Sequence, residues 1–111
     1  MPVVIVKDNV QEVLDALSKA KARGLEAIGS AAESHAKEII TEKKAVDTGR
    51  LRASITHASD GANAYIGTNV EYAPYVEFGT SKMKARSYLR PAATGFTSEY
   101  KSLMEESLRN A

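Results

Sequence analysis

Helical periodicity over residues 9–44 is the feature that most limits how this chain can fold. Apolar residues recur there at intervals of three and four, with lysine and glutamate between them, which is typical of an amphipathic helix. These apolar positions are Val10, Val13, Leu14, Leu17, Ala20, Leu25, Ile28, Ala32, Ala36, Ile39 and Ile40. We expect one helix of roughly 35 residues, about 50 Å long, capped by Asn9 and Glu12. Gly24 and Gly29 interrupt the pattern and predict either a kink or a close helix contact.

Length and composition restrict the classes of protein that this chain can belong to. The 111 residues fit one domain with a modest core. Alanine is frequent and tryptophan is absent among the 43% of apolar residues, so oligomerisation could supply additional burial. The absence of cysteine excludes disulfides and cysteine nucleophiles. A net charge of +1 gives no general attraction to nucleic acid or lipid. Because the longest apolar run is residues 3–6, we expect no membrane span and a soluble protein that is intracellular at synthesis.

Shorter elements are expected on both sides of the long helix. In order, they are an extended arm or edge strand (1–8), a β-hairpin (51–70) that turns at 60–63, a short helix (71–79), a basic loop (80–90) and a C-terminal helix (91–109). The arm is rich in β-branched residues, and another subunit is a candidate partner for it. The predicted fold class is α+β, with a long N-terminal helix and a C-terminal helix packed on a small antiparallel β-sheet.

Few residues suggest catalysis or metal binding. His35 lies beside the apolar stripe of the long helix and His57 lies in the expected hairpin, and neither has the spacing of a catalytic or zinc site. No nucleophile elbow, glycine-rich phosphate loop or zinc motif accompanies Asp47, Thr48 or Ser54. Asp47 and Thr48 are better suited to a turn. We therefore predict no catalytic residue, no bound metal and no cofactor.

Basic residues dominate residues 50–90, which contain only three acidic residues. The residues predicted for a partner interface are Arg50, Arg52, Lys82, Lys84, Arg86, Tyr88 and Arg90. One interpretation is contact with nucleic acid, in which Tyr88 stacks on bases. Another is contact with an acidic surface on a neighbouring subunit. Plain solvation is the third, and composition alone leaves all three open.

Aromatic residues precede the basic loop at helical spacing. Tyr72, Tyr75 and Phe78 are expected to lie in the core and to anchor the loop, because aromatic residues at this spacing are usually buried. Gly79 is expected to end the short helix. Glu77 is expected to meet Arg50, Arg52 or solvent.

Three ordered blocks of sequence carry a family resemblance. They are DTGRLRASI at residues 47–55, YAPYVEFGT at 72–80 and LRPA at 89–92. Together with the long helix, they resemble the gene-ten-like minor tail proteins of long-tailed phages, a family associated with tail completion and head-tail joining. The resemblance spans roughly residues 9–108.

The resemblance implies a non-enzymatic structural protein of the virion tail or neck, assembled in the host cytoplasm. Its partners would be other neck and tail proteins, without membrane contact. A homo-oligomeric ring is a further expectation, in which DNA passing through the channel would transiently meet the basic loop. The alternative function is a small nucleic-acid-binding module that uses residues 50–90.

Overall fold

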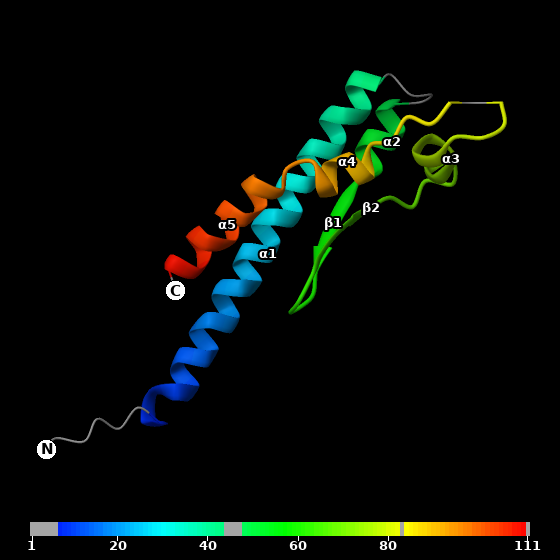
Figure 1. The fold of residues 1–111 in the computed structure, drawn as a ribbon. Helices are drawn as coiled ribbons and strands as arrows, with labels where there is room; N and C mark the ends of the chain where they lie inside the picture. Colours follow the sequence, from blue (N-terminus) through cyan, green and yellow to red (C-terminus); the bar gives the residue numbers. More distant parts are fainter. Residues whose placement is uncertain (1–6, 44–47, 83, 111) are drawn as a thin grey trace, which may run out of the picture.

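The computed structural model describes residues 7–43, 48–82 and 84–110 (Figure 1). Its elements in order are α1 (Lys7–Lys43), α2 (Thr48–Ser54), β1 (Thr56–Ser59), β2 (Ala64–Gly67), α3 (Ala73–Phe78), α4 (Leu89–Thr94) and α5 (Thr97–Arg109). The long N-terminal helix, the C-terminal helix and the small antiparallel sheet confirm the predicted α+β class. Within the described ranges, no helix combines the length and the apolar character needed to cross a membrane.

Helix α1 is the longest element, with 37 residues and a length of about 55 Å. It begins at Lys7, so Asn9 lies inside the helix and the predicted cap at Asn9 is wrong. Of the predicted N-terminal arm, residues 1–6 lie outside the described residues, and the last two belong to α1.

The two glycines of α1 allow close packing without interrupting the helix. Helix α5 runs antiparallel to α1 (Figure 1), and Ser107 Oγ donates a hydrogen bond to the Ala20 carbonyl at 2.6 Å. A Cβ at Gly24 would lie 2.6 Å from Met104 Sδ, and a Cβ at Gly29 would lie 2.9 Å from His57 Cδ2. The predicted close helix contact is therefore observed at Gly24, whereas Gly29 packs against strand β1.

His35 joins α1 to α5 through a structural contact. Its ring stacks on Phe96, with the centroids 3.6 Å apart and the planes at 2°. Its Nε2 atom lies 2.7 Å from Glu99 Oε2. These contacts assign His35 a packing role between the two helices.

The β-hairpin is shorter than predicted. Strands β1 and β2 pair antiparallel from Thr56↔Gly67 to Ser59↔Ala64, and Asp60 Oδ1 accepts the N–H groups of Ala62 and Asn63 in the turn. Residues 51–54, which were predicted as strand, belong to α2. Leu51 and Ile55 are both buried and lie four residues apart, so one helical turn directs them into the same core.

The C-terminal region forms two helices instead of the single helix predicted at 91–109. Helix α4 ends at Thr94, and Gly95 donates its N–H to the Pro91 carbonyl at 2.7 Å. Helix α5 starts at Thr97. The break lets α5 turn back along α1.

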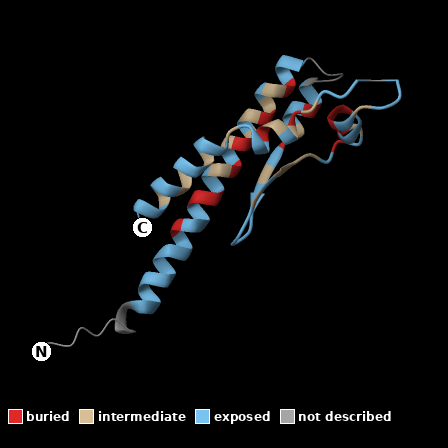
Figure 2. Ribbon diagram, in the orientation of Figure 1, coloured by how far each residue is buried: buried red, intermediate tan, exposed pale blue. Residues whose placement is uncertain are grey.

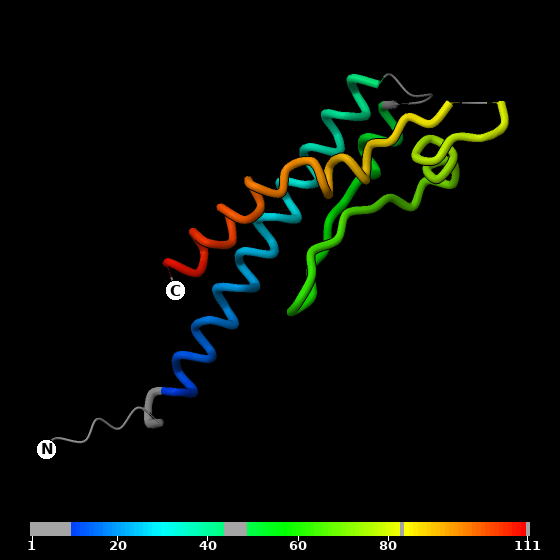
Figure 3. Tube along the Cα trace, in the orientation of Figure 1, coloured from blue at the N-terminus to red at the C-terminus, as the bar shows by residue number. Residues whose placement is uncertain are grey.

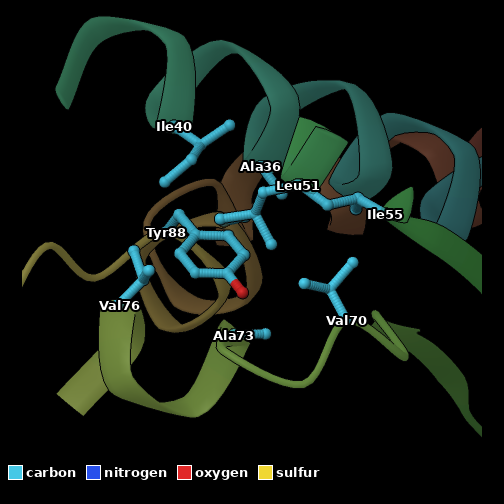
Figure 4. Packing of buried hydrophobic residues seen from close by; sticks show 9 residues of the cluster. Ala36, Ile40, Leu51, Ile55, Val70, Ala73, Val76 and Tyr88 are labelled. Carbon is cyan, nitrogen blue, oxygen red and sulfur yellow. The ribbon is translucent and has the colours of Figure 1, made fainter. Parts of the chain in front are cut away.

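The main core lies near the C-terminal end of α1. Its residues come from α1, α2, α3, α4 and the connections between them: Ala36, Ile40, Leu51, Ile55, Val70, Ala73, Val76, Tyr88 and Ala92. Figure 4 shows Tyr88 between Ile40 on one side and Ala73 on the other. Figure 2 shows that buried residues gather in this half of the molecule, whereas the N-terminal part of α1 is exposed. The two ends of α1 therefore have different environments.

A histidine held by two carboxylates connects β1 to α1. His57 Nε2 lies 2.6 Å from Glu26 Oε1, and Nδ1 lies 3.1 Å from Glu33 Oε1. The bond with Glu26, followed by that with Glu33, raises the pKa of His57 above its ordinary value of 6.5. His57 in turn lowers the pKa of Glu33 below 4.5. His57 thus bridges two turns of the helix through its two ring nitrogens.

We expect these ion pairs to make stability depend on pH. The His57 contribution is complete below pH 6.5 and is lost as pH rises through its raised folded pKa, whereas the Glu33 contribution is present above pH 4.5 and is lost as pH falls through its lowered pKa. Urea unfolding should therefore show stability falling as pH rises above 6.5 and passes through the raised pKa of His57. His57→Gln should flatten this change. An equally steep decline in the variant would contradict the assignment to His57.

Substitution of the two glycines should distinguish their contacts. Gly24→Ala should leave the free energy of unfolding unchanged or raise it by up to about 1 kcal/mol, because the flexible end of Met104 can move aside. Gly29→Ala should lower it by about 1 to 3 kcal/mol, because the opposing His57 ring is held by two carboxylates. Chemical denaturation of both variants measures the difference. Equal stability of the two would contradict a rigid contact at Gly29.

Candidate subunit interface

Helix α3 (Ala73–Phe78) packs at the side of the core through two small apolar residues. Tyr72 precedes the helix, and Ala73 and Val76 enter the core. Gly79 ends it with a φ of 76° and donates its N–H to the Tyr75 carbonyl at 2.8 Å. This backbone conformation favours glycine. The chain then leaves along the basic loop, which Figure 3 shows extending beyond α3.

The carboxylate of Glu77 connects α3 to α4. Glu77 is only 6% exposed. Its Oε1 accepts the N–H groups of Tyr88 and Leu89 at 2.9 and 2.8 Å, and its Oε2 accepts that of Arg90 at 3.3 Å. The negative charge therefore lies at the positive end of a helix and satisfies backbone donors that would otherwise lack partners. The expectation that Glu77 meets Arg50, Arg52 or solvent is wrong.

The sequence analysis predicted that Tyr88 belongs to an exposed interface, and this prediction is wrong. Its exposure is 0%, and Figure 4 shows its hydroxyl pointing between Val70 and Ala73. Burial, with a smaller effect from Glu77, raises the pKa of Tyr88 to about 12. The ring cannot stack on a nucleic-acid base in this position because it is fully buried.

Tyr75 and Phe78 do not serve as the buried anchors that were predicted. Tyr75 is 56% exposed and Phe78 is 79% exposed. Val76 and Glu77 occupy the buried face of α3 instead, so the helix turns both rings outward. Tyr72 is partly buried against the core. Phe78 is therefore a large apolar side chain presented on the surface.

The predicted basic residues divide into two groups. Arg50 donates to Glu71 Oε2 at 3.1 Å and lies over the Tyr72 ring, 5.4 Å from its centroid. Arg86 donates to the Lys43 carbonyl at 3.3 Å, at the end of α1. These two stabilise the fold locally. The other four predicted basic side chains are exposed: Arg52, Lys82, Lys84 and Arg90.

An apolar groove of about 580 Å³ opens between α3 and the start of α4. Val70, Ala73 and Pro74 line one part of it, and Phe78 and Leu89 line another. Arg90 also lines the groove. The Glu77 carboxylate fixes the distance between the two walls, because it belongs to one helix and binds the backbone of the other.

A second apolar surface lies at the opposite end of the molecule. Val10, Val13, Leu14 and Leu17 form a stripe on α1, and their exposures lie between 42% and 53%. Figure 1 shows that α1 continues beyond the ends of α5 and of the hairpin. The sequence pattern correctly predicted that these residues share one face of a helix. It did not predict that this face would be exposed to solvent. The 13-residue α5 covers only about 20 Å of a helix of about 55 Å.

Comparison with known proteins identifies the class that this arrangement belongs to. Residues 6–79 match the model of the HK97-gp10-like family, described as "Bacteriophage HK97-gp10, putative tail-component". The match includes α1, the hairpin and α3. The chain belongs to this family of phage tail components, as the resemblance in the sequence implied. No curated protein and no solved structure matches the chain.

The described residues do not meet the requirements of a metal site. Within the part of the chain that the structure describes, no three histidine, cysteine, aspartate or glutamate residues lie close enough to hold a metal ion. His57 and its two carboxylates are accounted for by the contact between β1 and α1.

Removing the charge of Glu77 should loosen both the fold and the groove. Glu77→Gln should lower the free energy of unfolding by about 3 kcal/mol, because the amide presents donors to backbone N–H groups. Glu71→Gln is the matched control: its pair with Arg50 is exposed, so solvent screens it and its loss should change stability much less. Urea denaturation of both variants measures the difference. A change of the same small size in Glu77→Gln would show that its buried carboxylate is dispensable.

Proposed function

We propose that this protein is a non-enzymatic structural subunit at the head-proximal end of a phage tail, where it completes the tail or joins it to the head. The observation that carries the proposal is the family match over residues 6–79. A tail component works through contacts with its neighbours in the virion. The proposed partners are other neck and tail proteins and further copies of this chain, and the proposed location is the virion after assembly in the host cytoplasm.

The distribution of exposed side chains supports a role in assembly. Phe78 and the stripe on α1 leave large apolar residues in water at two separate places. Contiguous apolar surface of this kind is uncommon on a protein that works alone and is typical of protein contacts. Both surfaces lie outside the core that holds the fold together.

The proposed assembly is a homo-oligomeric ring. Identical subunits that meet head to tail close into a ring when the rotation between neighbours fits a full turn. The basic residues Lys82 and Lys84 would then repeat around the ring, where they would contact either an acidic surface of a neighbour or DNA in transit. The alternative of a nucleic-acid-binding module is less well supported because Tyr88, the residue predicted to stack on bases, is buried.

The function is tested by deleting the gene in its phage or inducible prophage and imaging the lysate by negative-stain electron microscopy. We expect filled heads beside unattached or malformed tails. Normal, infectious virions would overturn the proposal, and salt-dependent binding of free DNA would then be the next property to measure.

The exposed lysines should be needed for assembly but not for folding. We expect the double variant Lys82→Ser, Lys84→Ser to melt like the parent protein and to complement the deletion poorly, measured as infectious particles. Lys101→Ser, which changes an exposed lysine on α5, is the control and should complement fully. Full complementation by the double variant would show that assembly does not need these lysines. Loss of cooperative melting would show that they stabilise the fold.

A further inference from the structure

We infer that the stripe on α1 of one subunit docks in the α3–α4 groove of a second copy of the same chain. This inference names the subunit contact of the proposed assembly and therefore rests on the proposed function. The stripe consists of Val10, Val13, Leu14 and Leu17, and the groove is the apolar surface to which Val70, Phe78 and Leu89 contribute.

The spacing of the stripe matches what a groove can receive. Its four residues stand at positions i, i+3, i+4 and i+7 of a continuous helix, which is the anchor pattern of amphipathic helices bound in hydrophobic grooves. The groove volume of about 580 Å³ is large enough for several side chains. Phe78, 79% exposed at its edge, supplies an aromatic surface that such a helix would cover.

One molecule cannot make this contact with itself. The groove shares Val70 and Ala73 with the core that contains Ile40 of α1. The stripe lies 23 to 30 residues before Ile40 on the same helix, a separation of about 35 to 45 Å. Because α1 is continuous between them, the partner must be a second molecule.

Charge favours this pairing over the pairing of two stripes. Residues 8–17 contain three acidic residues and no basic one, whereas residues 80–90, which enter the groove at Leu89 and Arg90, contain four basic residues and no acidic one. Two acidic residues also line the groove, but Glu71 is paired with Arg50 and Glu77 accepts backbone N–H groups at the start of α4. Glu12 and Asp15 lie on the side of α1 that faces away from the stripe. Salt screens electrostatic interactions over about 8 to 10 Å, which is close to the diameter of a helix. The charges of these two residues would therefore still act on the rim of the groove when the stripe is docked. Two parallel or antiparallel stripes would instead bring acidic segments together.

Contact area favours the same pairing. Two facing stripes would bury four apolar side chains on each molecule, whereas a stable interface uses roughly 20 to 30 residues a side. The groove alone is lined by eleven residues. A docked helix would also meet the basic loop beside the groove, so the head-to-tail contact has far more surface available.

Cysteine cross-linking tests the contact directly, because the chain has no native cysteine. A tagged copy carrying Leu14→Cys is mixed with an untagged copy carrying Phe78→Cys under mild oxidation. Both positions are largely exposed, so melting curves should match the parent protein. The mixed disulfide should form at least about tenfold faster than in a mixture of Lys19→Cys and Phe78→Cys, since docking raises the effective concentration of a correctly placed pair. Lys19 lies on the opposite face of α1.

Each result decides the matter. Equal rates in the two mixtures would overturn the inference. Faster disulfide formation between two Leu14→Cys copies than in the mixed pair would also overturn it and would show that the stripes pair with each other. Deletion imaging reports on the phage role independently, so a tail-joining defect without the mixed disulfide would leave the function standing and remove only this contact.

Discussion

The buried carboxylate of Glu77 is the interaction on which the interface end of the molecule depends. It accepts backbone N–H groups from Tyr88, Leu89 and Arg90 while its own helix contributes Val76 to the core. A charged acceptor removed from water is stabilising only when donors surround it. The start of α4 supplies them, so α3 and α4 hold each other in position. This contact holds the backbone of Tyr88 beside α3 and joins the two helices that line the groove.

Helix α1 provides the second constraint, because its length exceeds what the rest of the chain can cover. The small residues Ala20, Gly24 and Gly29 let α5 and β1 approach closely, and Ala36 and Ile40 enter the main core. The N-terminal turns of α1 would need additional helices or strands to cover them, beyond those in the described part of the chain. Its apolar stripe is consequently left in solvent, whereas in most small proteins such a stripe is the part of a helix that is buried.

Sequence patterns gave the fold class and failed where a tertiary contact decides a residue's environment. The period of 3.6 residues over α1 was strong enough to predict a long helix, and Gly79 and Asp60 marked their turns through local chemistry. Leu51 and Ile55 fit either a strand or one turn of helix, and only the shared core selects the helix. Tyr75 and Phe78 were predicted to be buried from their helical spacing, and Tyr88 was predicted to be exposed because it lies among basic residues. Glu77 joins α3 to the start of α4 through donors that lie eleven to thirteen residues further along the chain. No local pattern indicates that pairing.

The rigidity of α1 connects the fold to the proposed assembly. A contact made between opposite ends of a subunit repeats from copy to copy, and small changes in the angle between those ends decide whether the copies close into a ring or continue as an open filament. A kinked helix would leave that angle variable. Here both glycines of α1 are packed against Met104 and His57, so the positions most prone to bending are the ones that α5 and β1 support. The glycines that weaken an isolated helix therefore stiffen this one, because they admit the neighbours that hold it straight.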